Sequence, residues 1–310
     1  MSILFYILQI ILIPALSPLV VGIIRKIKAK FQLRAGASIF QPYNDIAKLF
    51  SKDETISRDA SWIFMIAPYI IFGVTILVGL SLPLVSTALA NHYTADFLVI
   101  IYLMAIGTFF LALAGIDVGS AFGGFGSSRE MTVSALAEGG LIFSLLTLAL
   151  IARSANLGQI VQAISALPLT SFLPVILAFI GFIIVMLAET ARFPFDNPAT
   201  HLELTMIHEA MILEYSGKRL ALIEWAAANK LLIFLTLGAN LFFPWGMATS
   251  LASSAILLAL GIFLVKILIL GFGIALLESS IAKYRFFRLP SLLFTSFIIC
   301  IVAIVMVIKF

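Results

Sequence analysis

Eight apolar stretches, joined by short polar connections, follow one another along the chain. An α-helix needs about 20 apolar residues to cross the hydrocarbon core of a bilayer, and each stretch is close to that length. They cover residues 3–24, 63–84, 97–114, 131–152, 172–188, 220–243, 251–277 and 289–308. The pattern predicts an all-α polytopic membrane protein with about eight transmembrane helices, in which residues 1–310 form one transmembrane domain.

Positive charge is distributed very unevenly over the connections. Fifteen of the 19 Lys and Arg residues lie in the loops at about 25–61, 115–130, 189–219 and 279–288, whereas the opposite loops and ends hold only Arg153 and Lys309. Because loops rich in Lys and Arg stay on the cytoplasmic side, we expect these four loops there and both termini on the non-cytoplasmic side. Basic residues follow the first apolar stretch instead of preceding it, which indicates a retained helix and not a signal peptide.

The composition indicates that lipid, and not water, surrounds most of the chain. Hydrophobic residues make up 62% of the chain and charged residues only 11%, far below the roughly 25% of soluble domains. The single cysteine, Cys300, excludes an intrachain disulfide and an iron–sulfur or zinc site built by this chain alone. The net charge of +4 is too small to indicate a nucleic-acid partner.

Two of the cytoplasmic loops have unusual composition. Residues 41–50, QPYNDIAKLF, have apolar positions near helical spacing and predict a short helix against the membrane surface or a partner, or an ordinary amphipathic connector. Residues 115–129 are rich in Gly and Ser, but no GxxxxGK[ST] motif accompanies them, so we expect a flexible turn and no nucleotide site.

The loop at 192–217 mixes acids and histidines with many large apolar side chains. A freely solvated loop has no need of those apolar groups, so we expect it to fold back into protein at membrane depth or to pack beneath a docked subunit. Its His and Glu residues do not follow the HExxH spacing, so no metal site is expected.

Ionisable residues also fall within or at the ends of the apolar stretches, notably Glu138, Glu189, Glu224, Lys230 and Lys266. Such groups are expensive in lipid and usually face the bundle interior or a wet passage. The carboxylates suggest a route for protons or ions. For the two lysines, snorkelling or structural pairing with a carboxylate is the alternative.

Two motifs resemble a known family. Residues 189–196, ETARFPFD, followed by EYSG at 214–217, are similar to the signature of the membrane-anchor subunit of respiratory complex I, the NuoH family. Arg129, nine residues before Glu138, fits the same family, and the similarity covers essentially the whole chain. The loop after the first helix and the stretches NPATHLELTMIHEAM and LESSIAKYRFFRLP resemble the hydrogenase branch, as in the HyfC and HycD subunits of formate hydrogenlyase-type complexes.

The resemblance implies roles for individual residues. It implies a proton path through Glu138, Glu189, Asp196, His201, Glu203, Glu214 and Glu224. It implies charge partners at Arg129, Arg192, Lys230 and Lys266. It implies a partner-docking loop with Pro194, Phe195, Tyr215 and Gly217.

It also implies a function and partners. The chain is expected to anchor an energy-converting nickel–iron hydrogenase or related complex in a bacterial or archaeal cell membrane. It would couple the hydrophilic large and small subunits to antiporter-like, proton-translocating subunits, with the nickel–iron centre and iron–sulfur clusters in partner chains. The alternatives are a quinone-site subunit of a complex I-type dehydrogenase, a stand-alone transporter and an inert anchor.

The chain departs from the complex I pattern after the PFD motif. Only Glu203 keeps its carboxylate there, His201 replaces an acid, and about three extra residues separate Glu203 from Glu214. His201, His208 or Glu209 can substitute in the path, because histidine titrates near neutral pH.

Overall fold

The computed structural model describes residues 2–87, 95–197, 206–249 and 252–309, which form helices and no strand. The long helices are α1 (Ser2–Phe31), α3 (Trp62–Ser81), α4 (Phe97–Asp117), α5 (Ala121–Ala152), α7 (Leu173–Glu189), α9 (Gly217–Leu241), α10 (Ser253–Ser280) and α11 (Leu289–Lys309). The short ones are α2 (Gln41–Phe50), α6 (Leu157–Ser165), α8 (His208–Ile212) and the 3-10 turns η2 (Leu169–Ser171) and η3 (Phe286–Arg288).

The eight long helices coincide with the eight predicted spans. Seven of the described helices are long and apolar enough to cross a membrane, and α7 is a shorter apolar helix of 17 residues. Since 17 residues is the lower limit for a span, the structure confirms an all-α polytopic membrane protein with about eight transmembrane helices.

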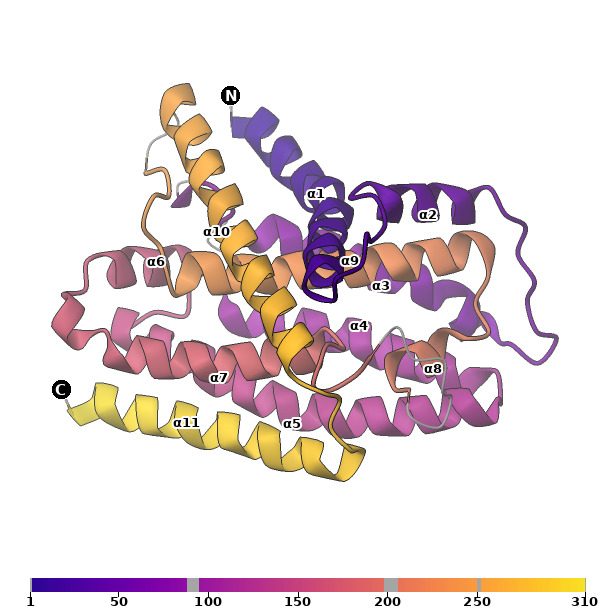
Figure 1. Ribbon diagram of the computed structural model, residues 1–310. Helices are drawn as coiled ribbons and strands as arrows, with labels where there is room; N and C mark the ends of the chain where they lie inside the picture. The colour runs from indigo at the N-terminus through magenta and orange to yellow at the C-terminus, as the bar shows by residue number, and fades with distance from the viewer. Residues whose placement is uncertain (1, 88–94, 198–205, 250–251, 310) are drawn as a thin grey trace.

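The helices pack around α9, the most buried span, with 67% of its apolar window inside the molecule. In Figure 1, α5, α7 and α11 lie side by side, α3 packs on α9, α4 lies between α3 and α5, and α1 and α10 cross over α9 at a steep angle.

The expectation of a flexible turn over residues 115–130 is wrong. Helix α4 continues to Asp117, and α5 begins at Ala121, where the Ser120 hydroxyl accepts the Gly123 backbone N–H at 3.1 Å. The start of α5 packs on α4 and α8, and such packing stabilises a helix more than intrinsic propensity does, so several glycines do not end it.

These glycines allow close helix packing. A Cβ on Gly123 would collide with the Gly115 carbonyl oxygen of α4, and one on Gly126 would lie 2.9 Å from the Ala210 Cβ of α8. Small residues at helix contacts are typical of membrane proteins, where packing drives association. The Gly-rich segment is therefore a contact surface for α4 and α8.

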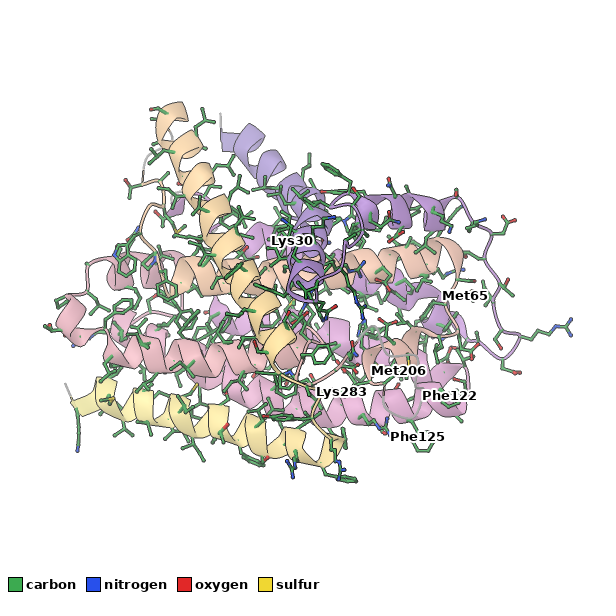
Figure 2. The ribbon with its side chains drawn as sticks, viewed as in Figure 1. Lys30, Met65, Phe122, Phe125, Met206 and Lys283 are labelled. Atoms are coloured by element: carbon green, nitrogen blue, oxygen red, sulfur yellow. The ribbon has the colours of Figure 1, made fainter. Side chains whose placement is uncertain are left out.

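Two short helices frame the bundle. Helix α2 forms over the residues predicted, 41–50, and packs on α1 and α9. Helix α6 was not predicted; the Asn156 carboxamide oxygen caps it by accepting from the Gly158 and Gln159 N–H groups. At the end of the molecule away from α6, Phe122 and Phe125 project outward from the first turns of α5 (Figure 2).

Candidate functional site: a charged cavity at the centre of the bundle

A cavity of about 540 Å³ lies where α1, α3, α4, α5, α7, α8, α9 and α10 converge. Its α3 and α4 wall is apolar, with Ile71, Val74, Met104 and Leu111. The charged or titratable residues that line it are Arg25, Lys28, Arg34, Glu130, Glu189, Arg192, Asp196, His208, Glu209, Glu224, Lys230 and Glu278. Twelve such groups around one cavity, most of them on spans or in the loop at 189–219, make it the candidate functional site.

Glu189 and Lys230 form an ion pair across the cavity. The Lys230 Nζ lies 2.8 Å from Glu189 Oε2 at the end of α7, and it also donates to the Thr108 hydroxyl of α4 at 3.2 Å. The Glu189 side chain is only 6% exposed, and its Oε1 is buried with no hydrogen-bond partner in the part of the chain that the structure describes. A buried carboxylate oxygen of this kind is a natural acceptor for a proton or a water molecule.

Glu278 joins three helix ends. One of its oxygens lies 2.7 Å from Arg192 Nη1, just after α7, and the other lies 3.0 Å from Lys28 Nζ on α1. Lys28 also sits 4.6 Å from the centre of the Phe193 ring. Because Glu278 is near the end of α10, this carboxylate ties α1, α7 and α10 together at the cavity wall.

Asp196 organises the loop that closes the cavity. Its Oδ2 accepts the backbone N–H groups of Ile207 and His208, each at 3.0 Å, which sets the start of α8. Its Oδ1 lies 2.6 Å from Lys283 Nζ. Lys283 belongs to the linker between α10 and α11, which Figure 2 shows beside Met206. The Asp196 carboxylate, in a residue only 2% exposed, thus joins the start of α8 to Lys283, which lies 87 residues after Asp196 in the chain.

His208 and Glu209 bring titratable groups to the cavity from the first turn of α8. Burial lowers the pKa of His208 to about 4, so the imidazole is neutral at pH 7. Burial and then the neighbouring charge of Glu224 raise the pKa of Glu209 to about 7. Glu209 can therefore take up and release a proton near neutral pH.

Several cavity residues were absent from the site predicted by the sequence. Glu130 is 8% exposed, lies on α5 and lines the cavity, but the sequence pattern placed it in a loop. Its spacing of eight residues from Glu138, two turns of one helix, is the signal that would have found it. Lys28 and Glu278, which also line the cavity, and Lys283, which pairs with the cavity residue Asp196, depend on long-range contacts that no local pattern reveals.

Other predicted path residues lie away from the cavity lining. Glu138 lies on α5, 17 residues after its first residue, and is partly buried beside the Ser134 hydroxyl. Arg129 donates to the Met206 carbonyl at 3.2 Å. Lys266 donates to the Phe243 carbonyl at 2.6 Å, and Glu214 is exposed. His201 and Glu203 lie outside the described residues.

The four residues of the expected partner-docking loop make contacts within the chain. Phe195 is 1% and Tyr215 is 4% exposed, and the Pro194 carbonyl accepts the Tyr284 N–H at 3.0 Å. Gly217 has φ +55°, and a Cβ there would lie 3.0 Å from the Lys52 carbonyl. These contacts fix the shape of the loop around the four residues.

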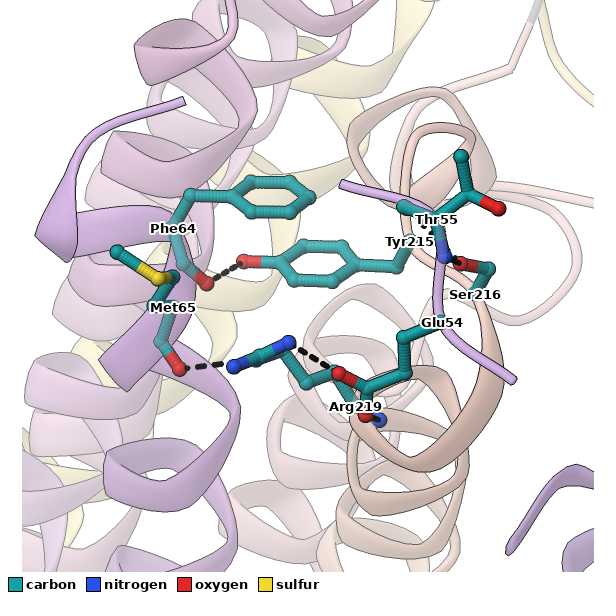
Figure 3. Close-up of polar contacts among 7 residues, drawn as sticks. All are labelled: Glu54, Thr55, Phe64, Met65, Tyr215, Ser216 and Arg219. Carbon is teal, nitrogen blue, oxygen red and sulfur yellow. Dashed lines mark hydrogen bonds and ion pairs between the residues drawn. The ribbon is translucent and has the colours of Figure 1, made fainter. Parts of the chain in front are cut away.

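The start of α9 is fastened to the α2–α3 loop by the contacts in Figure 3. The Tyr215 ring stacks on Phe64 at 3.9 Å between centroids, and its hydroxyl donates to the Phe64 carbonyl at 2.9 Å. Arg219 pairs with Glu54, and the Ser216 hydroxyl bonds both backbone groups of Thr55. The EYSG motif thus fixes a helix start.

Within the described ranges, no three His, Cys, Asp or Glu side chains group closely enough to hold a metal ion. The ionisable groups of the lining are carboxylates, an imidazole, ammonium groups and guanidinium groups. Carboxylates and imidazoles are side chains that transfer protons in many proteins.

Comparison with known proteins finds one matching family model and several related subunits. A family model described as NADH dehydrogenase matches residues 3–309. Formate hydrogenlyase subunit 4 of Escherichia coli (strain K12) is 33% identical over 298 residues, covering 96% of each chain. Hydrogenase-4 component C of the same organism is 34% identical over 284 residues, covering 92% of this chain and 89% of that protein.

More distant relatives follow. The NuoH-type subunit of the NADH-quinone oxidoreductase of Paraburkholderia xenovorans (strain LB400) is 27% identical over 287 residues, covering 87% of this chain and 78% of that protein. A chain in the structure of the membrane-bound sulfane sulfur reductase, an archaeal respiratory membrane complex, has a TM-score of 0.87 at 23% identity, with 99% of both chains covered. The fold is shared, and the resemblance to the NuoH family and its hydrogenase branch is confirmed.

Proposed function

The chain belongs to the NADH dehydrogenase family of membrane subunits, and from that premise we propose that it anchors and couples a multisubunit energy-converting hydrogenase or related redox complex. In this proposal the chain links a hydrophilic electron-transfer arm to antiporter-like subunits and passes protons between them. The hydrogenase-like large and small subunits would carry the nickel–iron centre and the iron–sulfur clusters.

The buried Glu189–Lys230 pair on the cavity wall carries this proposal. A carboxylate in this setting exchanges a proton when the position of its cation or its hydration changes, because both alter the free energy of its charged form. Glu130, Glu209 and Glu224 line the same cavity and would extend the route. His201 and Glu203, which lie in sequence between the cavity residue Asn197 and Met206, remain part of this proposal.

The direct test is proton translocation by the native complex, isolated through this chain and reconstituted in liposomes. Glu189→Gln keeps the shape of the side chain and removes its charge. We expect the variant complex to assemble and to transfer electrons to reduced or oxidised viologen dyes, but to lose coupled proton movement. Asp59→Asn, a change at an exposed carboxylate outside the cavity, is the matched control. Unchanged translocation in Glu189→Gln would favour an inert anchor.

A quinone-site subunit is the second candidate, because the cavity volume and its apolar α3–α4 wall suit a small aromatic ligand. If the chain is a quinone-site subunit, a photoreactive quinone analogue should label the α3–α4 wall in the native complex. Excess quinone should displace the analogue. Absence of labelling, together with translocation that depends on Glu189, would leave the hydrogenase-type coupling subunit as the function.

We further propose a bacterial or archaeal cell membrane, with both termini on the non-cytoplasmic side. The only native cysteine, Cys300, is buried, so single introduced cysteines can report the topology. With a membrane-impermeant maleimide, Lys52→Cys should react only in inverted vesicles and Ser165→Cys only in intact spheroplasts. Reaction on the opposite sides would reverse the orientation.

A further inference from the structure

A second cavity, of about 270 Å³, lies beneath α2 between α1 and α9. We call it the vestibule. Its apolar lining comes from Pro18, Pro42, Ile46, Leu49 and Leu220, and its charged lining from Arg25, Asp45 and Glu224. Val21, Arg25, Glu224 and Ala228 line both the vestibule and the central cavity. The two volumes therefore adjoin at these four residues.

Helix α2 is held in place as the roof of the vestibule. Pro18 has no N–H, so the Pro14 carbonyl one turn earlier in α1 lacks its helical donor, and the Trp225 indole N–H of α9 donates to it at 2.9 Å. The Tyr43 hydroxyl of α2 donates to the next carbonyl, that of Ala15. Phe50 packs edge-on against Trp225. These contacts fix α2 across the part of α1 that contains Pro14 and Pro18.

The charged groups of the vestibule follow one another from the protein surface toward the central cavity. Arg25 is exposed and also lines both cavities, so it marks a connection from the surface to the centre. Glu224 interacts electrostatically with Arg25 and Asp45, and Glu209 interacts with Glu224 and Arg25. Asp45 also accepts from the Gln41 side chain at 2.7 Å. Asp45, Glu224 and Glu209 are thus consecutive carboxylates from the α2 roof to the central cavity.

We propose that the vestibule is the proton intake of the central cavity, with Asp45 and Glu224 as the groups that receive and pass on the proton beside Arg25. The central cavity also opens toward the α1–α2 loop, but there the lining includes the cations Lys28 and Arg34. Cations raise the free energy of an approaching proton, whereas the vestibule carboxylates lower it. This inference rests on the proposed function, since it supplies the route by which protons reach Glu189.

The test measures protons taken up per electron transferred by the native complex in liposomes, with reduced methyl viologen as donor and a pH-sensitive dye as reporter. Asp45→Asn and Glu224→Gln remove each carrier, and Ala228→Leu narrows the junction without touching a charge. We expect each to lower proton uptake per electron roughly a hundredfold, the lower end of the effect of losing a positioned proton carrier. Asp53→Asn is the control, because Asp53 is an exposed carboxylate near α2 outside both cavities.

The outcomes separate this inference from the function on which it rests. If Glu189→Gln abolishes uptake but Asp45→Asn, Glu224→Gln and Ala228→Leu leave it at the wild-type ratio, the vestibule is not the intake and the proposed function stands. If Glu189→Gln has no effect either, both proposals are overturned. Equal losses in Asp53→Asn would show a surface-charge effect and would also overturn the intake.

Discussion

The Lys230 ammonium of α9 lies 2.8 Å from the Glu189 carboxylate of α7, with side chains only 18% and 6% exposed. Each charge offsets part of the desolvation free energy lost on burying the other, and either charge buried alone would be strongly destabilising. The same ammonium also bonds Thr108 on α4, so the pair connects three helices at the cavity. The pair is therefore both a structural joint and the centre of the proposed proton route.

Removing one member of this pair should be worse than removing both. Lys230→Met leaves Glu189 buried and unpaired, and we expect it to lower the free energy of unfolding in detergent micelles by about 3 kcal/mol. The double variant Lys230→Met/Glu189→Leu should recover most of that loss. Thermal unfolding of the single and double variants measures the difference. Additive losses would mean that the two charges do not stabilise each other.

The two neighbouring glycines of α5 should respond oppositely to alanine. A Cβ at Gly126 would lie 2.9 Å from the Ala210 Cβ and the Ile207 carbonyl, so Gly126→Ala should destabilise by about 1–3 kcal/mol. A Cβ at Gly124 meets nothing within 4 Å, so Gly124→Ala should stabilise by about 0.5–1 kcal/mol through the lower backbone entropy of the unfolded chain. Equal effects in unfolding experiments would mean that α5 does not pack closely on α8.

The Gly-rich start of α5 shows why part of the fold could not be predicted from the sequence. The eight spans could be predicted because apolar length alone defines them. The Gly- and Ser-rich residues 115–130 were assigned to a turn because glycine disfavours helices in water. Packing on α4 and α8 keeps this segment helical, and its glycines allow the neighbouring helices to approach closely, as at the contact of Gly126 with α8.

Asp196 should control the order of two distant segments. Asp196→Ala removes the acceptor of the Ile207 and His208 N–H groups and the partner of Lys283. We therefore expect faster hydrogen–deuterium exchange both at residues 206–212 and in the linker at 281–288. Glu214→Ala, at an exposed acid of the same loop, is the control and should leave both segments as they are. Faster exchange at only one segment would show that Asp196 does not link them.

Glu209 should make stability fall as the pH rises. Its pKa is about 7 in the folded protein against an ordinary 4.5, so between these values the folded state holds a proton that the unfolded state lacks. The resulting stabilisation is present below about pH 4.5 and is lost by about pH 7. His208, with its pKa lowered to about 4, contributes the opposite slope between about pH 4 and 6.5.

Comparison of Glu209→Gln with the wild type isolates the contribution of Glu209 to the pH dependence of stability, because His208 is common to both proteins. The melting temperature of the wild type relative to the variant should decline from pH 5 to pH 7.5 in the same detergent. A constant difference over this range would show that Glu209 is ionised throughout and does not exchange protons near neutrality.

The candidate site could be predicted only in part. Glu189, Arg192, Asp196, Glu224 and Lys230 were identified from the motif or from their place in apolar stretches, and the structure brings all five to one cavity. Glu278 and Lys283 were counted only as residues at helix ends or in loops. Their roles arise from ion pairs with Arg192 and Asp196 across more than 80 residues, which depend on how the spans pack.

The central claim is that the Glu189 carboxyl gains and loses a proton during turnover. Redox-triggered infrared difference spectroscopy of the reconstituted complex measures this directly, because a protonated carboxyl has a C=O band that a carboxylate lacks. The account predicts a band in the wild type that appears and disappears with reduction and is absent in Glu189→Gln. A wild-type spectrum without that band, or the same band retained in Glu189→Gln, would contradict it.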